Sequence, residues 1–283
     1  MKRFHVIPER NEANGVCRVA DLLAQEDGGT VCTCAEAASS RWTVADEVWV
    51  HGAWLPMEWR VCRKALGLGC RLVRMTHGSF SPVYLKGHGR WKKRMAGPVE
   101  RFFLRRADRV MATCEAEAGW IRAYEPRVKA VEITELKRFF DLGGNGRVVR
   151  TGGAPLRLLY LGRRHPLKGI VFLEEAVRAV KRAGRAVELC VACNTFGEQK
   201  ERMWDWCDVL VLPTLSENFG LVVAEALERG KRVITTDGAP AWGDVGDCGG
   251  RLTYLVGFRD GNDERRVRLL EKAIARESDF LVQ

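Results

Sequence analysis

Short runs of apolar and β-branched residues alternate with stretches of helical periodicity along the whole chain. In the first half, these runs predict strands at Phe4–Ile7, Thr30–Cys34, Glu47–His51, Arg71–Thr76, Arg109–Thr113 and Lys129–Ile133. The stretches between them predict helices at Gly15–Leu23, Met57–Ala65, Lys93–Arg106 and Glu115–Tyr124. Alternation of this kind is typical of parallel sheets with helices on both faces.

A glycine-rich segment, Asp141–Pro155, interrupts the pattern and is predicted to be a linker. The alternation then restarts, with strands at Leu156–Leu161, Val187–Val191, Asp208–Leu212 and Arg232–Thr235, and helices at Lys168–Arg182, Gly220–Arg229 and Asn262–Ala275. The sequence therefore predicts two Rossmann-like α/β domains facing a cleft, residues 1–150 and 151–283, with the last helix a candidate to pack back on the first domain. Ligands of such sheets bind at the carboxyl ends of the strands.

The composition is typical of a globular protein. The chain has 283 residues, of which 46% are hydrophobic and 29% charged. No run approaches the roughly 20 apolar residues that span a bilayer, and the first residues lack the apolar core of a signal peptide. The ten cysteines are unpatterned, and neither Cys32/Cys34 nor Cys190/Cys193 has a second pair or a histidine at zinc-ligand spacing. We expect a cytoplasmic protein with reduced thiols, a metal or redox role being the alternative.

The net charge of +10 is concentrated in one segment. Residues 57–110 contain fourteen Lys and Arg against three acidic residues, a local net charge of +11, so the rest of the chain carries −1. Such a patch favours an acidic partner, and nucleic acid is the weakest candidate because no recognised nucleic-acid-binding motif accompanies it. Residues 86–109 gather basic side chains around Trp91, which predicts binding to an anionic membrane surface: Lys86, Arg90, Lys92, Lys93 and Arg94. The alternative is a helix with a solvated basic face.

The segment LGRRHPLKG, residues 161–169, follows a predicted strand and opens a helix. Gly162 allows close approach of a ligand to the backbone. Arg163 and Lys168 place cations near a helix N-terminus, where free N–H groups also favour an anion. This chemistry suits a diphosphate, the alternative being an ordinary strand–turn–helix with basic surface residues.

The segment PTLSENFGLVVAEALERGKRVITT, residues 213–236, places two carboxylates after another strand. Glu217 lies in the loop, and Glu225 follows eight residues later inside the helix. Carboxylates accept hydrogen bonds from sugar hydroxyls, and in dinucleotide-binding folds they bind the ribose. The N–H groups of Gly220 and Leu221 are placed for phosphate oxygens. The alternative is a capped amphipathic helix with two solvated glutamates.

Together, LGRRHPLKG and SENFGLVVAEAL resemble the donor site of the retaining family-four glycosyltransferases, which have the GT-B fold. The resemblance implies that Arg163 and Lys168 neutralise the donor diphosphate. It also implies a Glu-x7-Glu motif, in which Glu217 holds hydroxyls of the transferred sugar and Glu225 holds the ribose. The other residues that it assigns to donor binding are Gly162, Asn218, Phe219, Gly220 and Leu221.

The first half also resembles this family, in particular members that build lipopolysaccharide and exopolysaccharide. The similar segments are VHGAW at 50–54, MTHGSFSP at 75–82 and residues 89–122. The resemblance makes His77 the histidine that approaches the donor sugar and phosphate, whereas a lone histidine considered by itself is more often structural. Asn14, Gly15 and His51 are further candidates to contact acceptor or phosphate.

The resemblance implies transfer of a hexose-type sugar, with retention, from a nucleotide-diphosphate sugar to a saccharide or lipid-linked saccharide. No Asp-x-Asp motif is present, so we expect no metal and no cofactor. Only residues 194–207 separate two strands where relatives fit another strand and helix, which leaves the nucleotide base open. Two alternatives remain: a catalytically silent sugar-nucleotide-binding or scaffold protein, and another enzyme of the same fold, such as a nucleotide-sugar epimerase or a phosphorylase.

Overall fold

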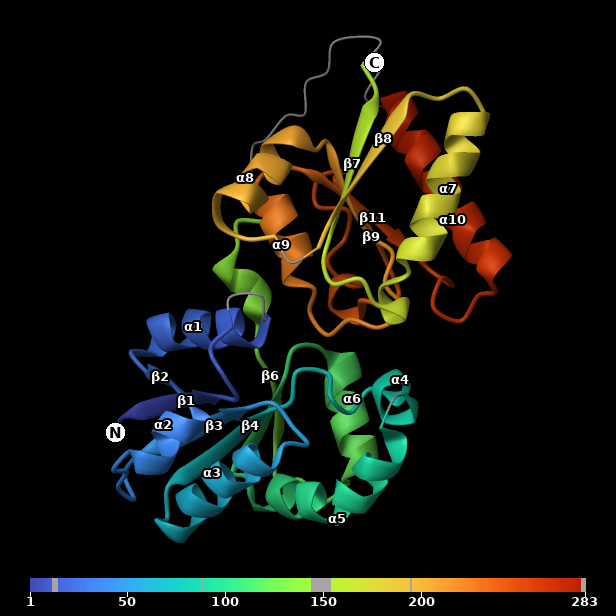
Figure 1. Ribbon diagram of the computed structural model, residues 1–283. Helices are drawn as coiled ribbons and strands as arrows, with labels where there is room; N and C mark the ends of the chain where they lie inside the picture. Colours follow the sequence, from blue (N-terminus) through green and yellow to red (C-terminus); the bar gives the residue numbers. More distant parts are fainter. Residues whose placement is uncertain (12–14, 88, 144–153, 194, 281–283) are drawn as a thin grey trace. The chain divides into compact units, whose positions relative to one another are not determined.

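The computed structural model describes residues 1–11, 15–87, 89–143, 154–193 and 195–280. The chain divides into two compact units, Met1–Leu136 and Lys137–Gln283. Each unit is a Rossmann-like α/β domain with one parallel sheet, which confirms the predicted fold class (Figure 1). In the described part of the chain, no helix is both long and apolar enough to cross a membrane.

The first unit contains a six-stranded parallel sheet in the order β2-β1-β3-β4-β5-β6. Its strands are β1 (Arg3–Ile7), β2 (Thr30–Thr33), β3 (Glu47–His51), β4 (Arg71–Met75), β5 (Arg109–Ala112) and β6 (Val131–Ile133). The register pairs His5 with Trp49 and His51 with Met75. Because side chains alternate between the faces along a strand, His5, Trp49 and His51 share one face, and Val6 lies on the other.

Helices cover both faces of this sheet. They are α1 (Gly15–Asp27), α2 (Cys34–Ser39), α3 (Pro56–Gly67), α4 (Pro82–Lys86), α5 (Arg90–Arg106) and α6 (Glu115–Tyr124). The larger core contains Val61 of α3, Leu104 of α5 and Ile121 of α6. Cys17 and Ala20 of α1 pack with Ile7 in a separate cluster, so α1 covers the face that carries His5.

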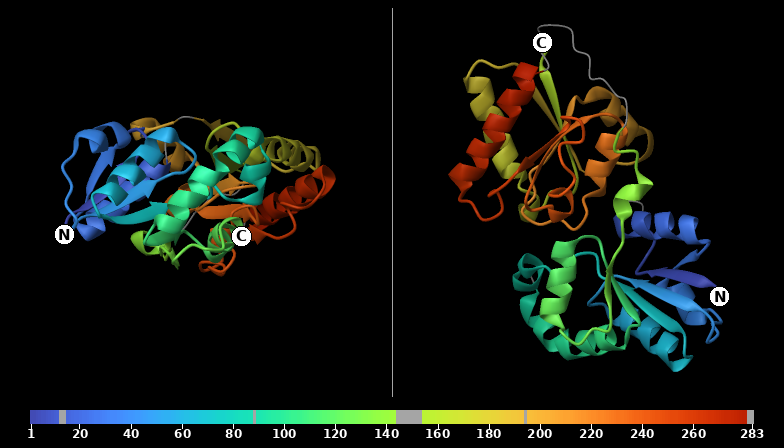
Figure 2. Two further views of the ribbon diagram at one scale, coloured as in Figure 1. Left: turned by 90° about the horizontal axis from the view of Figure 1, so that it is seen from below. Right: turned by 180° about the vertical axis from the view of Figure 1, so that it is seen from behind.

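The second unit contains a five-stranded parallel sheet in the order β11-β10-β9-β7-β8. Its strands are β7 (Leu156–Leu161), β8 (Val187–Ala192), β9 (Val209–Leu212), β10 (Arg232–Thr236) and β11 (Leu252–Leu255). Its helices are α7 (Ile170–Arg182), α8 (Gly197–Trp206), α9 (Leu221–Glu228) and α10 (Asp263–Phe280). Figures 1 and 2 show α7 and α10 on one face of the sheet and α8 and α9 on the other. The last helix packs against α7, within its own unit.

All ten predicted strands are present, with limits within two residues of those expected, and all seven predicted helices are present. The pattern missed β11 and the helices α2, α4 and α8. Helix α8 buries only Trp204 and is otherwise strongly polar, so its apolar periodicity is weak. Helix α2 has six residues and depends on a capping box between Thr33 and Glu36. Residues 144–153 of the predicted linker lie outside the described residues.

Part of the basic segment 57–110 is structural. The Arg74 guanidinium is fully buried and donates to the Glu100 carboxylate at 2.7 Å, and Trp59 Nε1 donates to the same carboxylate at 2.6 Å. Lys64 Nζ donates to three carbonyl groups at the end of α2. These cations hold the fold together, so the cationic surface of the segment is smaller than its sequence indicates.

Candidate functional site

The strand order of the second unit creates a topological switch point between β7 and β9. The sheet continues from β7 to β8 on one side and from β9 to β10 and β11 on the other. Loops therefore leave the carboxyl ends of β7 and β9 in opposite directions, which is where open α/β sheets bind ligands. Residues 162–169 follow β7 and residues 213–220 follow β9. Both sequence motifs thus lie at the switch point.

The loop after β7 presents two cations. The Arg163 side chain is exposed, and Lys168, which ends a short 3₁₀ turn, is partly buried. The buried Tyr160 hydroxyl donates to the Arg163 carbonyl at 2.7 Å, which fixes the backbone there. Gly169 has a φ of +64°, and a Cβ at this position would collide with the Pro213 carbonyl oxygen. Glycine is therefore required for the two loops to meet.

Backbone hydrogen bonds join the loops to one another. The Leu167 carbonyl accepts from Leu215 N at 2.8 Å and from Thr214 Oγ1 at 3.1 Å. Glu217 N donates at 2.8 Å to the carbonyl of Gly238, in the loop after β10. Glu217 is thus positioned by loops that follow three neighbouring strands.

Lys168 Nζ and the Glu217 carboxylate form an ion pair at the centre of this site. The side chains are 16% and 21% exposed, so both can be reached from solvent. The other Glu217 oxygen accepts from Asn218 N at 3.2 Å. The site therefore holds a cation suited to phosphate beside an acceptor suited to hydroxyl groups.

Helix α9 begins at Leu221, directly after Gly220, which has a left-handed φ of +73°. Val223 N donates to the Gly220 carbonyl at 2.9 Å, whereas the first amides of an α-helix have no acceptor within the helix, and the helix dipole favours an anion there. Phe219 is buried, with its ring centroid 5.4 Å from that of Trp242, and its carbonyl accepts from Trp242 Nε1. Phe219 thus supports the loop, and Gly220 and Leu221 offer the amides.

Glu225 projects from α9 and pairs with Lys200 of α8 at 2.7 Å. The Glu225 side chain is 19% exposed, so its carboxylate remains accessible. Sequence reasoning missed Lys200, because the polar sequence of α8 carries too little apolar periodicity to place a helix there. The pair holds Glu225 in one orientation on the exposed edge of α9.

In the first unit, His77 follows β4 in a tight turn, with a φ of +48°. One oxygen of the buried Glu117 carboxylate accepts from Thr76 Oγ1 at 3.0 Å and from Gly78 N at 2.5 Å. The other oxygen accepts from both the N–H and the hydroxyl of Thr113. Glu117, which the sequence did not indicate, therefore fixes the backbone on both sides of His77.

His77 is the end of a chain of hydrogen-bonded side chains. Its Nε2 lies 3.0 Å from Nδ1 of His51, and His51 Nε2 lies 3.0 Å from Nδ1 of His5. His5 Nε2 lies 3.1 Å from a carboxylate oxygen of Asp27. His51 is fully buried with both nitrogens engaged, so it offers no atom to an acceptor or phosphate. Gly15 begins α1, and Asn14 lies outside the described residues.

Burial lowers the pKa of all three histidines. The pKa of His77 falls to about 4, that of His51 lies well below 6.5, and that of His5 is lowered although Asp27 opposes the effect. The three rings are therefore neutral at pH 7.

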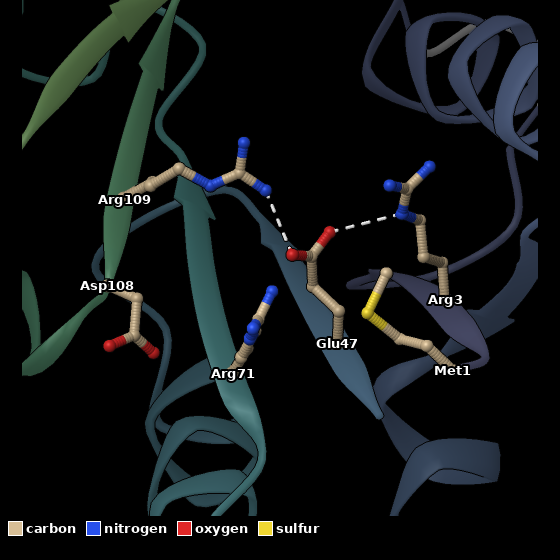
Figure 3. A pocket seen from close by; sticks show the side chains of 6 residues that line it. All are labelled: Met1, Arg3, Glu47, Arg71, Asp108 and Arg109. Atoms are coloured by element: carbon tan, nitrogen blue, oxygen red, sulfur yellow. Dashed lines mark hydrogen bonds and ion pairs between the residues drawn. The ribbon is translucent and has the colours of Figure 1, made fainter. Parts of the chain in front are cut away.

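A cavity of about 460 Å³ opens at the amino ends of the strands of the first sheet (Figure 3). Its lining residues are Met1, Arg3, Glu47, Arg71, Asp108 and Arg109. Glu47 pairs with Arg3 at 3.2 Å and with Arg109 at 2.9 Å, so two of the arginines are already neutralised. The cavity lies at the amino ends of the strands, opposite to the edge where parallel sheets bind ligands. We assign it no role in the reaction.

Comparison with known proteins agrees with this architecture. Residues 15–135 match the glycosyl transferase 4-like domain, and residues 155–264 match glycosyl transferases group 1. Two Rossmann-like domains of these kinds define a glycosyltransferase of the GT-B fold. The two matches together cover most of the chain, and the chain belongs to the family-four glycosyltransferases. In the comparison with curated proteins, none matches this chain.

Solved structures show the same fold at low sequence identity. Sucrose-phosphate synthase from Thermosynechococcus elongatus is 15% identical, with a TM-score of 0.67 over 100% of this chain and 92% of that one. WaaG, a glycosyltransferase involved in lipopolysaccharide biosynthesis, is 12% identical, with a TM-score of 0.60 over 99% and 92%. S. aureus MnaA, in a co-structure with UDP, is 13% identical, with a TM-score of 0.52 over 98% and 87%.

Proposed function

We propose that this protein transfers a hexose-type sugar from a nucleotide-diphosphate sugar to a saccharide or lipid-linked saccharide, with retention of configuration. The observation that carries this proposal is the Lys168–Glu217 pair at the switch point of the second sheet. The sequence segments that resemble enzymes of lipopolysaccharide and exopolysaccharide synthesis favour a place in cell-surface polysaccharide synthesis, at the cytoplasmic side of the membrane.

Donor binding exchanges the partners of the ion pair. Lys168 turns from the Glu217 carboxylate to the more highly charged diphosphate, and Glu217 then accepts hydrogen bonds from hydroxyls of the transferred sugar. Arg163 and the first amides of α9 face the same phosphates. The charge that develops on the leaving diphosphate is thus stabilised by groups already in position.

The same groups make the proposed reaction independent of a metal ion and of any cofactor. Arg163 and Lys168 supply two positive charges where a divalent ion would otherwise neutralise the diphosphate. Glu225, held by Lys200, is placed to accept hydrogen bonds from the ribose hydroxyls of the donor.

Helix α5 supports binding at an anionic membrane surface, where a lipid-linked acceptor would be found. Four large apolar side chains lie exposed on it, from 40% to 74%: Trp91, Met95, Val99 and Phe102. At about 100° per residue they fall within about 80° of the helix circumference, and so form one stripe. Exposed Lys92 and Arg94 flank the stripe, and exposed Arg106 lies at its C-terminal end, over the Phe102 ring. An apolar stripe between cations is the pattern of a helix that lies in the membrane interface.

The test of donor binding is a thermal-shift screen with nucleotide-diphosphate sugars of different bases and sugars. A ligand at about 100 times its Kd adds about 2.7 kcal/mol of apparent stability. The matched variants are Arg163→Ala and Arg164→Ala, because Arg164 is the adjacent cation but pairs with Glu174 at 3.1 Å. We expect Arg163→Ala to lose the shift and Arg164→Ala to keep it. Equal shifts in both variants would contradict the assignment of the diphosphate to Arg163.

A catalytically silent sugar-nucleotide-binding protein is the second candidate, favoured by the short segment between β8 and β9. That segment forms α8, whose Lys200 contacts Glu225. Hydrolysis of the bound donor, or transfer to an added acceptor, separates the enzyme from the silent protein.

A further inference from the structure

A chain of hydrogen-bonded rings crosses three neighbouring strands of the first sheet. It runs from Asp27, at the end of α1, through His5 of β1 and His51 of β3 to His77 after β4. His5 and His51 are fully buried, and the Asp27 side chain is 13% exposed. We call these four residues the histidine relay. Buried polar groups in a continuous chain restrict one another, because each must find both a donor and an acceptor.

The carboxylate at one end sets the direction of the chain. An ionised carboxylate only accepts hydrogen bonds, so the proton between Asp27 and His5 belongs to His5 Nε2. A neutral imidazole carries one N–H, so His5 Nδ1 is an acceptor and receives the N–H of His51 Nε2. The same rule makes His51 Nδ1 an acceptor for the N–H of His77 Nε2. His77 Nδ1 is then left with a lone pair and no proton.

The orientation of Asp27 is itself fixed. Its second oxygen accepts from Gly29 N at 2.8 Å, and Arg3 lies 3.5 Å from the oxygen that faces His5. Any side chain at Gly29 would crowd both the Asp27 carboxylate and the His5 ring. The other charged group beside His5 is Glu47, which is engaged by Arg3 and Arg109.

We propose that Asp27, His5 and His51 are positioning residues, which lock His77 in the Nε2–H tautomer so that its Nδ1 accepts a hydrogen bond from a hydroxyl of a substrate. Among the described residues, no partner of His77 Nδ1 is assigned. A lone pair cannot donate to a phosphate oxygen, so this atom selects a hydroxyl over the diphosphate. The tautomer lock rests on the geometry alone, and only its use toward a sugar hydroxyl rests on the proposed transfer.

The low pKa values of the three histidines agree with a lock. A proton added to His5 or His51 would put two N–H groups face to face in one hydrogen bond, and burial opposes a positive charge on all three rings. The lock therefore holds at neutral pH.

The test reads the tautomer directly, by ¹⁵N NMR of histidine-labelled full-length protein near pH 7.5. In the wild-type protein we expect the proton on Nε2 in His5, His51 and His77, with scalar coupling across both N–H···N bonds. In Asp27→Asn the new amide keeps its oxygen on Gly29 N–H and turns its NH₂ toward His5 Nε2. This change should move the proton to Nδ1 in all three rings.

The matched control is Asp21→Asn, which makes the same change on the same helix at a residue that pairs with Arg10 and contacts no histidine. It should leave all three tautomers unchanged. We also expect Asp27→Asn to lower kcat about tenfold or more relative to Asp21→Asn, with donor affinity from thermal shift unchanged. If Asp27 had a purely structural role, its substitution would leave the proton of His77 on Nε2.

A wild-type His77 with its proton on Nδ1 overturns the inference, even if Asp27→Asn does not fold. Unchanged tautomers in a folded Asp27→Asn protein also overturn it. If the wild-type protein shows no sugar transfer with any donor, the proposed function fails, while the NMR result still decides the lock.

Discussion

At the scale of single residues, the proposed donor site contains charged side chains that pair with one another. Lys168 pairs with Glu217, and Glu225 pairs with Lys200. A partly buried ion pair adds little net stability, because desolvation offsets the attraction. The effect of these pairs is on orientation, because each side chain is held in a defined position by its partner.

The first prediction removes one member of the central pair. Lys168→Ala and Glu217→Ala should each lower the transfer rate by roughly 10²-fold, or about 3 kcal/mol, because each loses a group that stabilises or orients the reacting donor. Circular dichroism should show an intact fold, since both side chains are at the solvent edge. Arg164→Ala is the control and should remain near the wild-type rate. Wild-type rates in the two variants would refute the assignment.

The second prediction concerns Glu58, whose side chain is buried at the start of α3. Burial raises its pKa from 4.5 to about 7, with Arg74 opposing the shift. Between these values the folded protein holds a proton that the unfolded chain has lost. The stability that this group contributes is therefore complete below pH 4.5 and is lost as the pH rises through 7. At about 1.4 kcal/mol per pKa unit, the loss is on the order of 3 kcal/mol.

Glu58→Gln stays neutral and should escape this loss. Urea unfolding of both proteins at pH 5 and pH 8 should show that the variant gains stability relative to wild type at the higher pH. The quantity to compare is the difference in unfolding free energy between the variant and the wild-type protein at each pH. This difference cancels the effect of the histidines, whose lowered pKa values change stability in the opposite direction below pH 6.5. Glu115→Gln, at an exposed carboxylate of α6, is the control. Parallel pH profiles for wild type and Glu58→Gln would exclude a raised pKa.

At the scale of elements, helix α5 has one buried face and one exposed apolar face. Gly97, Glu100, Phe103 and Leu104 are buried against the unit, whereas the stripe that begins at Trp91 is exposed. The structure places Val99 and Phe102 at the surface. Lys93 donates to the Tyr84 carbonyl and lies 3.6 Å from its ring centroid, so it anchors α4 to α5.

The third prediction is therefore made without changing Lys93. The protein should co-sediment with anionic but not with neutral liposomes, and raised salt should weaken the binding. Lys92→Glu with Arg94→Glu should lower binding, by about 1 kcal/mol for each basic residue lost. Trp91→Ala should weaken binding even at low salt. The control with the same charge change is Lys181→Glu with Arg182→Glu, on exposed positions of α7. Equal binding to neutral and anionic vesicles would contradict the proposal that α5 binds an anionic membrane surface.

At the scale of the whole molecule, the two units carry different parts of the chemistry. The second unit contains the proposed donor site, and the first contains the histidine relay and the α5 stripe. Strand order places the two loops of the second unit and His77 of the first, because each follows the carboxyl end of a strand.

The fourth prediction concerns the complete reaction. Transfer should survive EDTA, because in the proposed site the charges of Arg163 and Lys168 neutralise the diphosphate and the α9 amides donate hydrogen bonds to it. The product should keep the anomeric configuration of the donor, as measured by NMR. An absolute requirement for Mg²⁺ or Mn²⁺ would show that other groups handle the diphosphate. An inverted product would contradict the proposed retention.

The sequence by itself determined the order and type of most elements, because strand and helix periodicity are local properties of the chain. It also indicated the two segments that the structure brings to one switch point, since residues 161–169 and 213–225 each lie within one strand–loop–helix unit. It could not reveal α8, whose polar sequence lacks that periodicity, and it therefore missed Lys200.

Only the tertiary structure decided which distant residues meet. Neighbouring members of the histidine relay are separated in sequence by 22 to 46 residues, and parallel strand order together with the packing of α1 brings them together. In the sequence, Arg74 belongs to the basic segment 57–110, but in the structure it is buried in the core and pairs with Glu100. Local periodicity identifies which residues form a strand, but side-chain partners across a parallel sheet depend on strand order and register, which non-local contacts set.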